Sequence, residues 1–424
     1  MRASKRMRAA VLVGAVAFGA LGGGVGVASG GAQAQARVSG PGANASASDP
    51  TQGIPSDLIG LVMASMTIEE KVGQLFMIDT DALEHGVRAD DRQLGISQAQ
   101  TDNLQRYGPG GIIMFGGNVA SASQIAQYVA DLQAASPIPL LIAADEEGGT
   151  VSRLTAAGVD EFPDMAVIGA TGDPGKARQV GETIGRQMAA LGFNVDLAPV
   201  ADVNTNPANP VIGDRAFGSD PALVAAMVAA EVEGLQIEVS ATLKHFPGHG
   251  DTGSDSHTGL ASVAHDLDRL RAVELVPFAA GIEAGAHLIL TAHVSAPAID
   301  PSGVPATMSR ALLTDVLRGE LGFEGLIVTD ALDMAAIQDY YSVEDIVTGC
   351  IDAGVDILLV PHDFHAAYDT FVALVQSGRI SEERVDESLR RILSLKLSQI
   401  PGFLGGLSAR NVEATLNLQL SSET

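Results

Sequence analysis

The segment from Lys244 to His257 concentrates side chains that can transfer protons or bind polar ligands. It reads Lys-His-Phe-Pro-Gly-His-Gly-Asp-Thr-Gly-Ser-Asp-Ser-His and holds three His, two Asp and one Lys. Its Gly and Pro residues favour a loop over a helix. The apolar run from Val239 to Leu243 that precedes it favours a buried strand. We therefore predict a loop at the end of a strand, which is where the chemistry of an enzyme often lies.

Short apolar runs alternate with segments of helical period from about residue 56 to residue 400. The predicted strands are 75–78, 111–115, 140–144, 193–200, 239–243, 288–292, 326–329 and 357–360. Asp173-Pro174 and Asp220-Pro221 are typical helix starts, and Gly192 and Gly354 are typical helix ends. Buried strands that alternate with helices form a parallel sheet with right-handed crossovers.

This pattern predicts an α/β fold: a TIM-type (β/α)8 barrel in a single domain. A doubly wound open sheet is the alternative. No Gly-x-Gly-x-x-Gly follows the first predicted strand, which disfavours the nucleotide-binding version of that fold.

Charged and polar side chains follow the predicted strands at the end where a barrel carries its active site. They lie in Asp145 to Arg153 after the third strand, Asp202 to Arg215 after the fourth, Lys244 to His257 after the fifth, Thr291 to His293 after the sixth, Thr329 to Met334 after the seventh, and His362-Asp363 after the eighth. Acids, Arg, Lys and His that converge on one pocket fit recognition of a hydroxyl-rich ligand combined with acid–base chemistry. A purely structural role would require several buried charged networks at one end of the barrel.

The chain resembles glycoside hydrolase family 3, in its β-N-acetylglucosaminidase branch, through the motif Lys-His-Phe-Pro-Gly-His-Gly-Asp-Thr followed by Asp-Ser-His. The resemblance extends over most of the barrel, through Met66 to Leu75, Asp145 to Arg153, Asn209 to Phe217, Glu274 to Phe278 and Val328 to Asp330. The chain differs from the family pattern Asp-Gln-Glu-Gly-Gly-Arg at Glu146 and Thr150, near the expected contacts to the distal sugar hydroxyls. The resemblance implies a TIM barrel and an exo-acting, retaining β-N-acetylhexosaminidase. Its substrates would be peptidoglycan- or chitin-type fragments with terminal β-linked N-acetylglucosamine, and no cofactor is implied.

The resemblance also implies roles for individual residues. Asp330, after the seventh strand, falls on the position of the nucleophile, and Asp255 and His257 fall on those of an acid/base dyad. The residues that fall on contacts to the sugar hydroxyls and the acetamido group are Asp145, Arg153, Arg215, Lys244 and His245.

These roles suit the chemistry of the side chains. In retaining hydrolysis a carboxylate attacks the anomeric carbon while an acid protonates the leaving oxygen. A carboxylate near Arg and Lys, as expected for Asp330, stays ionised at neutral pH. His257 titrates near neutrality and can donate and then accept a proton, and Asp255 can orient it. Asp333 is the rival nucleophile, although we expect it to begin a helix.

Other functions fit parts of the same pattern. A metal-dependent hydrolase would use His245, His249, His293 and Asp330, although no combination of residues has convincing ligand spacing, so we expect no metal. A non-catalytic sugar-binding protein would not need His257 or Asp330. A β-glycoside phosphorylase is a closer variant, since a His acid/base does not repel incoming phosphate. A β-glucosidase on the same barrel is a further alternative.

The N-terminal segment predicts export. Arg2, Lys5, Arg6 and Arg8 precede an apolar run from Ala9 to Leu21, and Ala32-Gln33-Ala34 is a small-x-small cleavage site. We therefore assign 1–36 to a signal peptide, 37–55 to a flexible linker, 56–400 to the barrel and 401–424 to a C-terminal tail. An uncleaved membrane anchor is the alternative for the first segment.

Composition limits the partners of this chain. Removing the four positive side chains of the signal would take the formal net charge from −26 to −30. Such a charge disfavours nucleic acid and anionic membranes as partners, but it does not disfavour small neutral oligosaccharides. A single Cys excludes any internal disulfide. We expect a secreted, extracytoplasmic monomer with no membrane contact after cleavage of the signal.

Overall fold

The computed structural model describes residues 56–87, 93–254 and 259–403. Among these residues, one parallel sheet contains β1 (Phe76–Ile78), β2 (Gly111–Ile113), β3 (Leu141–Ala144), β4 (Val195–Asp196), β5 (Ser240–Phe246), β7 (Leu288–Thr291), β9 (Leu326–Val328) and β10 (Leu358–Leu359). The predicted signal peptide and linker lie outside the described residues, as do Asp255, His257 and most of the predicted tail.

The order of the strands in space makes the sheet a barrel. Neighbouring strands follow the order β10-β1-β2-β3-β4-β5-β7-β9, all parallel. A further parallel bridge joins Val328 of β9 to Ile357, the residue before β10, and so connects the two ends of the sheet. The predicted TIM-type barrel is therefore confirmed, and the open doubly wound sheet is wrong.

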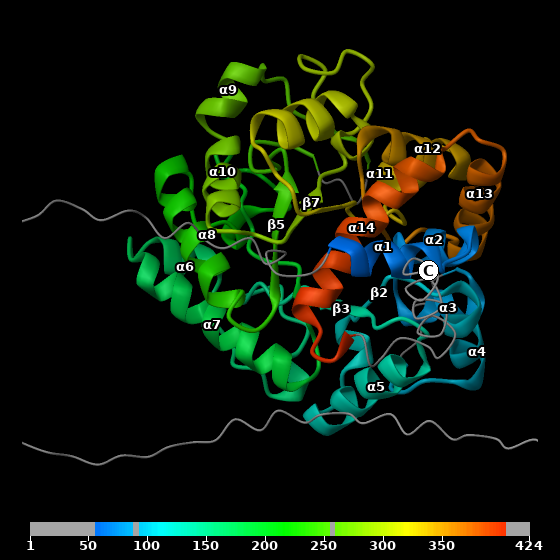
Figure 1. The fold of residues 1–424 in the computed structure, drawn as a ribbon. Helices are drawn as coiled ribbons and strands as arrows, with labels where there is room; N and C mark the ends of the chain where they lie inside the picture. The colour runs from blue at the N-terminus through cyan, green and yellow to red at the C-terminus, as the bar shows by residue number, and fades with distance from the viewer. Residues whose placement is uncertain (1–55, 88–92, 255–258, 404–424) are drawn as a thin grey trace, which may run out of the picture. The chain divides into compact units, whose positions relative to one another are not determined.

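Helices surround these strands (Figure 1). They are α1 (Ser56–Ala64), α2 (Ile68–Gln74), α3 (Thr80–His85), α4 (Gln98–Tyr107), α5 (Ala122–Ala135), α6 (Met165–Gly169), α7 (Pro174–Ala190), α8 (Pro221–Leu235), α9 (Leu267–Ala272), α10 (Leu275–Glu283), the π-helix η5 (Ala311–Glu320), α11 (Ala335–Gln338), α12 (Val343–Ala353), α13 (Phe364–Gln376) and α14 (Glu382–Gln399). Asp173 and Asp220 cap α7 and α8, and Gly354 ends α12 with a positive φ, as the sequence predicts.

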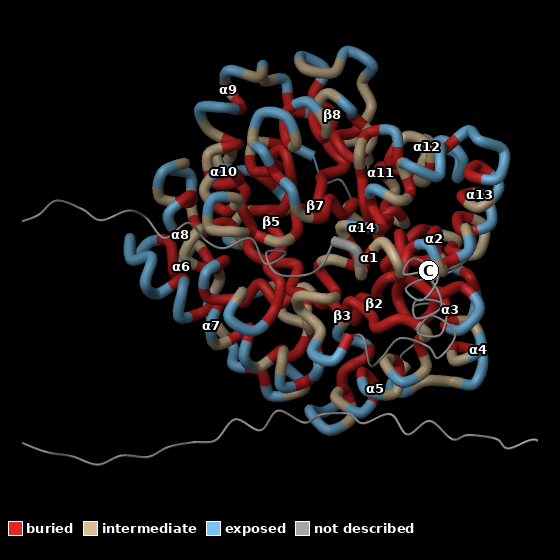
Figure 2. The backbone as a smooth tube through the Cα atoms, in the orientation of Figure 1, coloured by how far each residue is buried: buried red, intermediate tan, exposed pale blue. Residues whose placement is uncertain are grey.

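The core lies between the strands and these helices, and the strands are buried along their length (Figure 2). Leu, Ile and Val side chains of β2, β3, β7 and β9 are at most 2% exposed. Burial on both faces explains why these strands appear in the sequence as continuous apolar runs.

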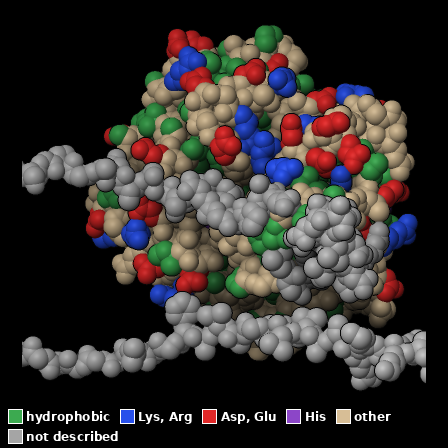
Figure 3. Space-filling model, viewed as in Figure 1, with side chains coloured by type: hydrophobic (Ala, Val, Ile, Leu, Met, Phe, Trp, Pro, Cys, Tyr) green, Lys and Arg blue, Asp and Glu red, His purple; other side chains and the backbone are tan. Residues whose placement is uncertain are grey.

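The end of the barrel where the strands begin is held by a buried ionic network. Asp356, just before β10, accepts hydrogen bonds from Arg318 Nη2 at 2.6 Å, Ser388 Oγ at 2.7 Å and Arg391 Nη1 at 3.1 Å. Lys and Arg side chains gather close to α14 on the face shown in Figure 3. Charges at this end of a barrel stabilise the fold, because the functional loops follow the opposite strand ends.

β5 is longer than predicted and includes Lys244 and His245, which the sequence placed in the loop. Its pairing with β7 shifts register between Leu243 and Phe246. Such an irregularity interrupts the strict alternation of side chains between the two faces of a strand. The adjacent Lys244 and His245 can therefore both face the same cavity.

Candidate active site

A cavity of about 660 Å³ lies where the strands end. Six of the eight predicted site residues line it: Asp145, Arg153, Arg215, Lys244, His245 and Asp330. The other two, Asp255 and His257, lie outside the described residues. Residues far apart in the sequence thus form one concave site of the size that small-molecule ligands occupy.

Lys244 lies at the centre of the charge network in this cavity. Its Nζ is 2.7 Å from Asp145 Oδ1 and 2.5 Å from Glu147 Oε1, and its side chain is 2% exposed. Burial alone would lower the pKa of Lys244, but the two carboxylates outweigh burial and raise it. Lys244 is therefore a permanent cation that holds Asp145 at the cavity wall.

Glu147 was not predicted as a site residue, yet it connects two of the cations of the cavity, Lys244 and Arg215. Its carboxylate accepts two parallel hydrogen bonds from Arg215, at 2.8 Å from Nε and 2.7 Å from Nη2. Burial would raise the pKa of Glu147, but Lys244 and Arg215 outweigh this effect and lower it to about 2. The paired geometry fixes the plane of the Arg215 guanidinium.

His245 is oriented by a second buried carboxylate. Its Nδ1 is 2.7 Å from Oδ2 of Asp202, which is fully buried, so Nδ1 carries a proton that Asp202 accepts. The backbone N–H of His249 donates to the other oxygen, Oδ1, at 2.6 Å. The remaining ring nitrogen of His245, Nε2, is 3.5 Å from Arg215 Nη2. Asp202 therefore sets which edge of the imidazole faces the cavity.

Arg153 is positioned through its backbone. The buried carboxylate of Glu146 accepts hydrogen bonds from the Arg153 and Leu154 N–H groups, at 2.8 and 2.9 Å, and from the Ser152 hydroxyl. Glu146 does not line the cavity, so its difference from the family pattern concerns loop support. Thr150 does line the cavity, but its hydroxyl donates to Asp164 at 2.7 Å.

Asp330 lies two residues after the end of β9 and is held by contacts with the backbone. Its N–H donates to the Thr291 carbonyl at 3.1 Å, and its Oδ1 accepts from the Ala331 N–H at 2.9 Å. The buried His293 ring contacts the Ala331 carbonyl through Nε2 at 2.9 Å and the Thr307 hydroxyl through Nδ1 at 2.8 Å. His293 thus supports the loop that carries Asp330 and does not line the cavity.

Asp333 lines the same cavity as Asp330. It precedes α11, whose first residue is Ala335, so the expected helix begins two residues later than predicted. Asp333 remains the rival nucleophile on geometry alone.

The metal-site hypothesis concerns His245, His249, His293 and Asp330. Both ring nitrogens of His293 are within hydrogen-bond distance of Thr307 and Ala331, as described above. Within residues 56–87, 93–254 and 259–403, no group of three or more His, Cys, Asp or Glu side chains is arranged to hold a metal ion.

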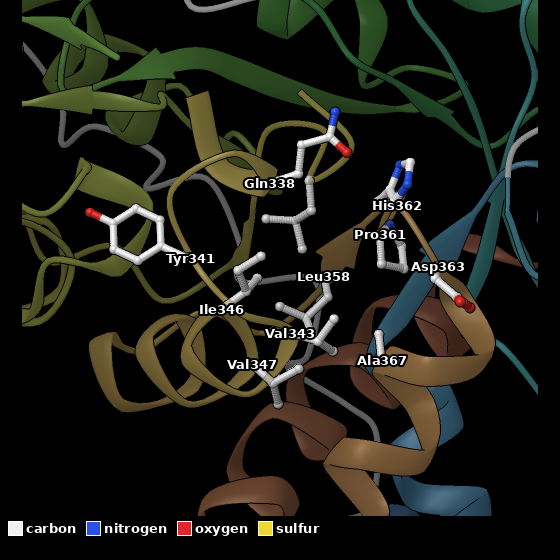
Figure 4. Close-up of a pocket in the computed structure, with 11 residues that line it drawn as sticks. Gln338, Tyr341, Val343, Ile346, Val347, Leu358, Pro361, His362, Asp363 and Ala367 are labelled. Carbon is white, nitrogen blue, oxygen red and sulfur yellow. The ribbon is translucent and has the colours of Figure 1, made fainter. Parts of the chain in front are cut away.

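A second, apolar cavity of about 270 Å³ lies behind the Asp330 loop. Leu332 lines it, whereas the flanking Ala331 and Asp333 line the polar cavity. Figure 4 shows Tyr341 and His362 on opposite sides of this apolar cavity, with Ile346 and Leu358 between them. The loop that carries Asp330 therefore lies between an apolar cavity and a more polar one.

A model of the glycosyl hydrolase family 3 N-terminal domain matches residues 67–395. The chain belongs to glycosyl hydrolase family 3. It is 39% identical over 359 residues to β-hexosaminidase A of Pseudoalteromonas piscicida, a match that covers 76% of this chain and 60% of that protein. It is 38% identical over 319 residues to a β-hexosaminidase of Stenotrophomonas maltophilia (strain R551-3), covering 73% of this chain and 88% of the relative.

Solved structures give the same family. The family 3 β-N-acetylglucosaminidase of Paenibacillus sp. str. FPU-7 matches with a TM-score of 0.74 and 42% identity, over 79% of this chain and 63% of that one. The β-N-acetylhexosaminidase of Beutenbergia cavernae DSM 12333 matches with a TM-score of 0.70 and 34% identity, over 78% of this chain and 98% of that one. The present chain therefore spans less than two thirds of the length of the Pseudoalteromonas and Paenibacillus proteins and nearly all of the length of the Beutenbergia protein.

Proposed function

We propose that this chain is an exo-acting, retaining β-N-acetylglucosaminidase that releases terminal β-linked N-acetylglucosamine. The observation that carries the proposal is the convergence of Asp330 with the Lys244 network on one cavity. The relatives described above are β-hexosaminidases and a β-N-acetylglucosaminidase, which agrees with this activity. A neutral sugar suits the site, because its hydroxyls can bond to charged groups that are already paired with each other.

In this proposal the sugar is held by the cations and carboxylates of the cavity. Asp145 and Lys244, joined at 2.7 Å, present one acceptor and one donor to neighbouring hydroxyls. Arg215, Arg153 and His245 present further N–H groups to the ring and the acetamido group. Because Glu147 and Asp202 fix Arg215 and His245 before substrate binds, little reorganisation is needed on binding.

Asp330 attacks the anomeric carbon as the glycosidic bond breaks, and the leaving oxygen takes a proton from His257. Water then attacks the glycosyl-enzyme, His257 accepts a proton from that water, and Asp330 leaves as a free carboxylate. Asp255 orients His257 and favours its protonated form.

The experiment is product analysis with a chromogenic β-N-acetylglucosaminide. Proton NMR early in the reaction should show the β anomer of free N-acetylglucosamine, at the same rate with and without phosphate. Formation of the α anomer would exclude retention. Accumulation of a sugar 1-phosphate would make the chain a phosphorylase, and a preference for β-glucosides over N-acetylglucosaminides would make it a β-glucosidase.

We further propose that the substrates are peptidoglycan- or chitin-type fragments outside the cytoplasm. The support is the N-terminal sequence, in which basic residues precede an apolar run and a small-x-small cleavage site. The described part of the chain contains no helix long and apolar enough to cross a membrane. The formal net charge of −26 favours small neutral fragments over polyanionic polymers.

A further inference from the structure

The loop between β5 and α9 is anchored on both sides of the segment that carries the proposed acid/base dyad. On the outgoing side, Asn206 Nδ2 donates to the Thr252 carbonyl at 3.0 Å, and Asn209 Nδ2 donates to the His249 carbonyl at 2.8 Å. On the returning side, β6 (Ala261–Ser262) pairs in parallel with β8 (Val294–Ser295). Both sides of the loop are therefore attached to the barrel independently of each other.

A direct contact joins the two sides. His265 Nε2 on the returning side is 2.5 Å from Asp251 Oδ2 on the outgoing side. The other Asp251 oxygen, Oδ1, accepts a hydrogen bond from the Thr205 hydroxyl at 2.6 Å. Asp251 thus connects three segments: the loop after β4, the start of the loop after β5, and its end.

Arg269 and Glu274 lie beside Asp251 and His265, and we call these four residues the loop-base cluster. Arg269 Nη2 is 2.9 Å from Oε1 of Glu274, which is 1% exposed. A Cβ at Gly248 would lie 2.8 Å from the Glu274 Cβ, so Glu274 packs directly under the start of the loop. Burial would raise the pKa of Asp251, but the Thr205 hydroxyl and His265 outweigh burial and lower it.

We infer that Asp251 and His265 are positioning residues that set where the acid/base dyad stands relative to the sugar. Asp255 and His257 lie between them in the sequence. Holding the two ends of a chain segment together reduces the conformations that the segment can adopt. This inference rests on the proposed function, because it assumes that His257 is the acid.

The test uses the dependence of rate on the leaving group. The full chain and its Asp251→Asn variant are compared on aryl β-N-acetylglucosaminides from dinitrophenyl to phenyl, with kcat/KM reporting glycosylation. General-acid assistance is worth about 100- to 10,000-fold, and a displaced acid loses part of it. Asp251→Asn should lower kcat/KM about tenfold or more for phenyl and less than about twofold for dinitrophenyl.

Two further variants separate positioning from general damage to the fold. Thr205→Val removes one hydrogen bond to Asp251 and should give the same pattern in weaker form. Asp352→Asn breaks an exposed ion pair to Arg379 of 2.8 Å and should leave the whole series unchanged. A loss of equal factor across the series for Asp251→Asn and Thr205→Val, or no loss, would overturn the positioning role.

His257→Ala, measured in the same series, separates this inference from the proposed function. A leaving-group dependence in His257→Ala but not in Asp251→Asn rejects only the positioning role. A flat series for His257→Ala rejects the assignment of the acid, and the positioning role is rejected with it.

Discussion

Glu147 is the buried carboxylate that pairs with both Lys244 and Arg215, and the cost of replacing it can be worked out from the structure. Its pKa is lowered from 4.5 to about 2, because Lys244 and Arg215 outweigh burial. That difference corresponds to about 3 kcal/mol of folding free energy. The value agrees with the roughly 3–5 kcal/mol lost when one partner of a buried ion pair is removed. Glu147→Gln should therefore lower the free energy of unfolding at neutral pH by about 3 kcal/mol.

The sign of the pH dependence follows from the lowered pKa of Glu147. A carboxyl group whose pKa is lower in the folded protein stabilises the fold above its unfolded pKa and loses that effect as the pH falls. The deficit of Glu147→Gln should therefore shrink between pH 4.5 and about 2. The assay is denaturant unfolding of both proteins across this window and at neutral pH.

The matched control is Glu233→Gln, which breaks an ion pair to Arg178 in which both side chains are about half exposed. Its cost should stay below about 1 kcal/mol. A Glu147→Gln cost equal to that of the control, or one that does not change with pH, would refute the reasoning about the Lys244 network.

Three further predictions concern other parts of the chain. Burial and nearby Glu147 raise the pKa of Glu231 from 4.5 to about 8, so the fold should lose stability as the pH rises from 4.5 to about 8. The Tm of Glu231→Gln should therefore rise relative to that of the wild type across this window, and a constant difference in Tm would contradict this. Activity should be unchanged after dialysis against a chelator, and a loss that zinc restores would support the metal-dependent alternative. Exported protein should begin near Gln35 or Arg37 by N-terminal sequencing, whereas a start at Met1 in a membrane fraction would support the anchor.

The fold was predictable because each element shows its own pattern in the sequence. Continuous apolar runs indicated strands buried on both faces, and the capping residues Asp173 and Asp220 marked helix starts that the structure confirms. The end of β5 was predicted wrongly, since Lys244 and His245 are polar and look like loop residues. Their burial is stabilised by Asp145, Glu147 and Asp202, which lie after β3 and β4, so these partners are not apparent from the local sequence around β5.

The supporting residues of the site were harder to predict than those expected to touch substrate. Glu146 and Glu147 are adjacent and identical, yet one holds a loop backbone and the other holds Arg215 and Lys244. Asp202 and His293 likewise act through neighbours, by orienting His245 and by supporting the Asp330 loop. Such roles depend on which side chains meet in space, so a linear pattern does not distinguish them.

The most direct test of the account is to identify the residue that becomes glycosylated. A fluorinated N-acetylglucosaminide with a good leaving group, whose glycosyl-enzyme is hydrolysed slowly, is incubated with the wild type, Asp330→Asn and Asp333→Asn. Mass spectrometry should show one glycosyl unit attached in the wild type and in Asp333→Asn, mapped by proteolysis to Asp330, and none in Asp330→Asn. A label on Asp333, or a labelled and active Asp330→Asn variant, would contradict the assignment of Asp330 as the nucleophile.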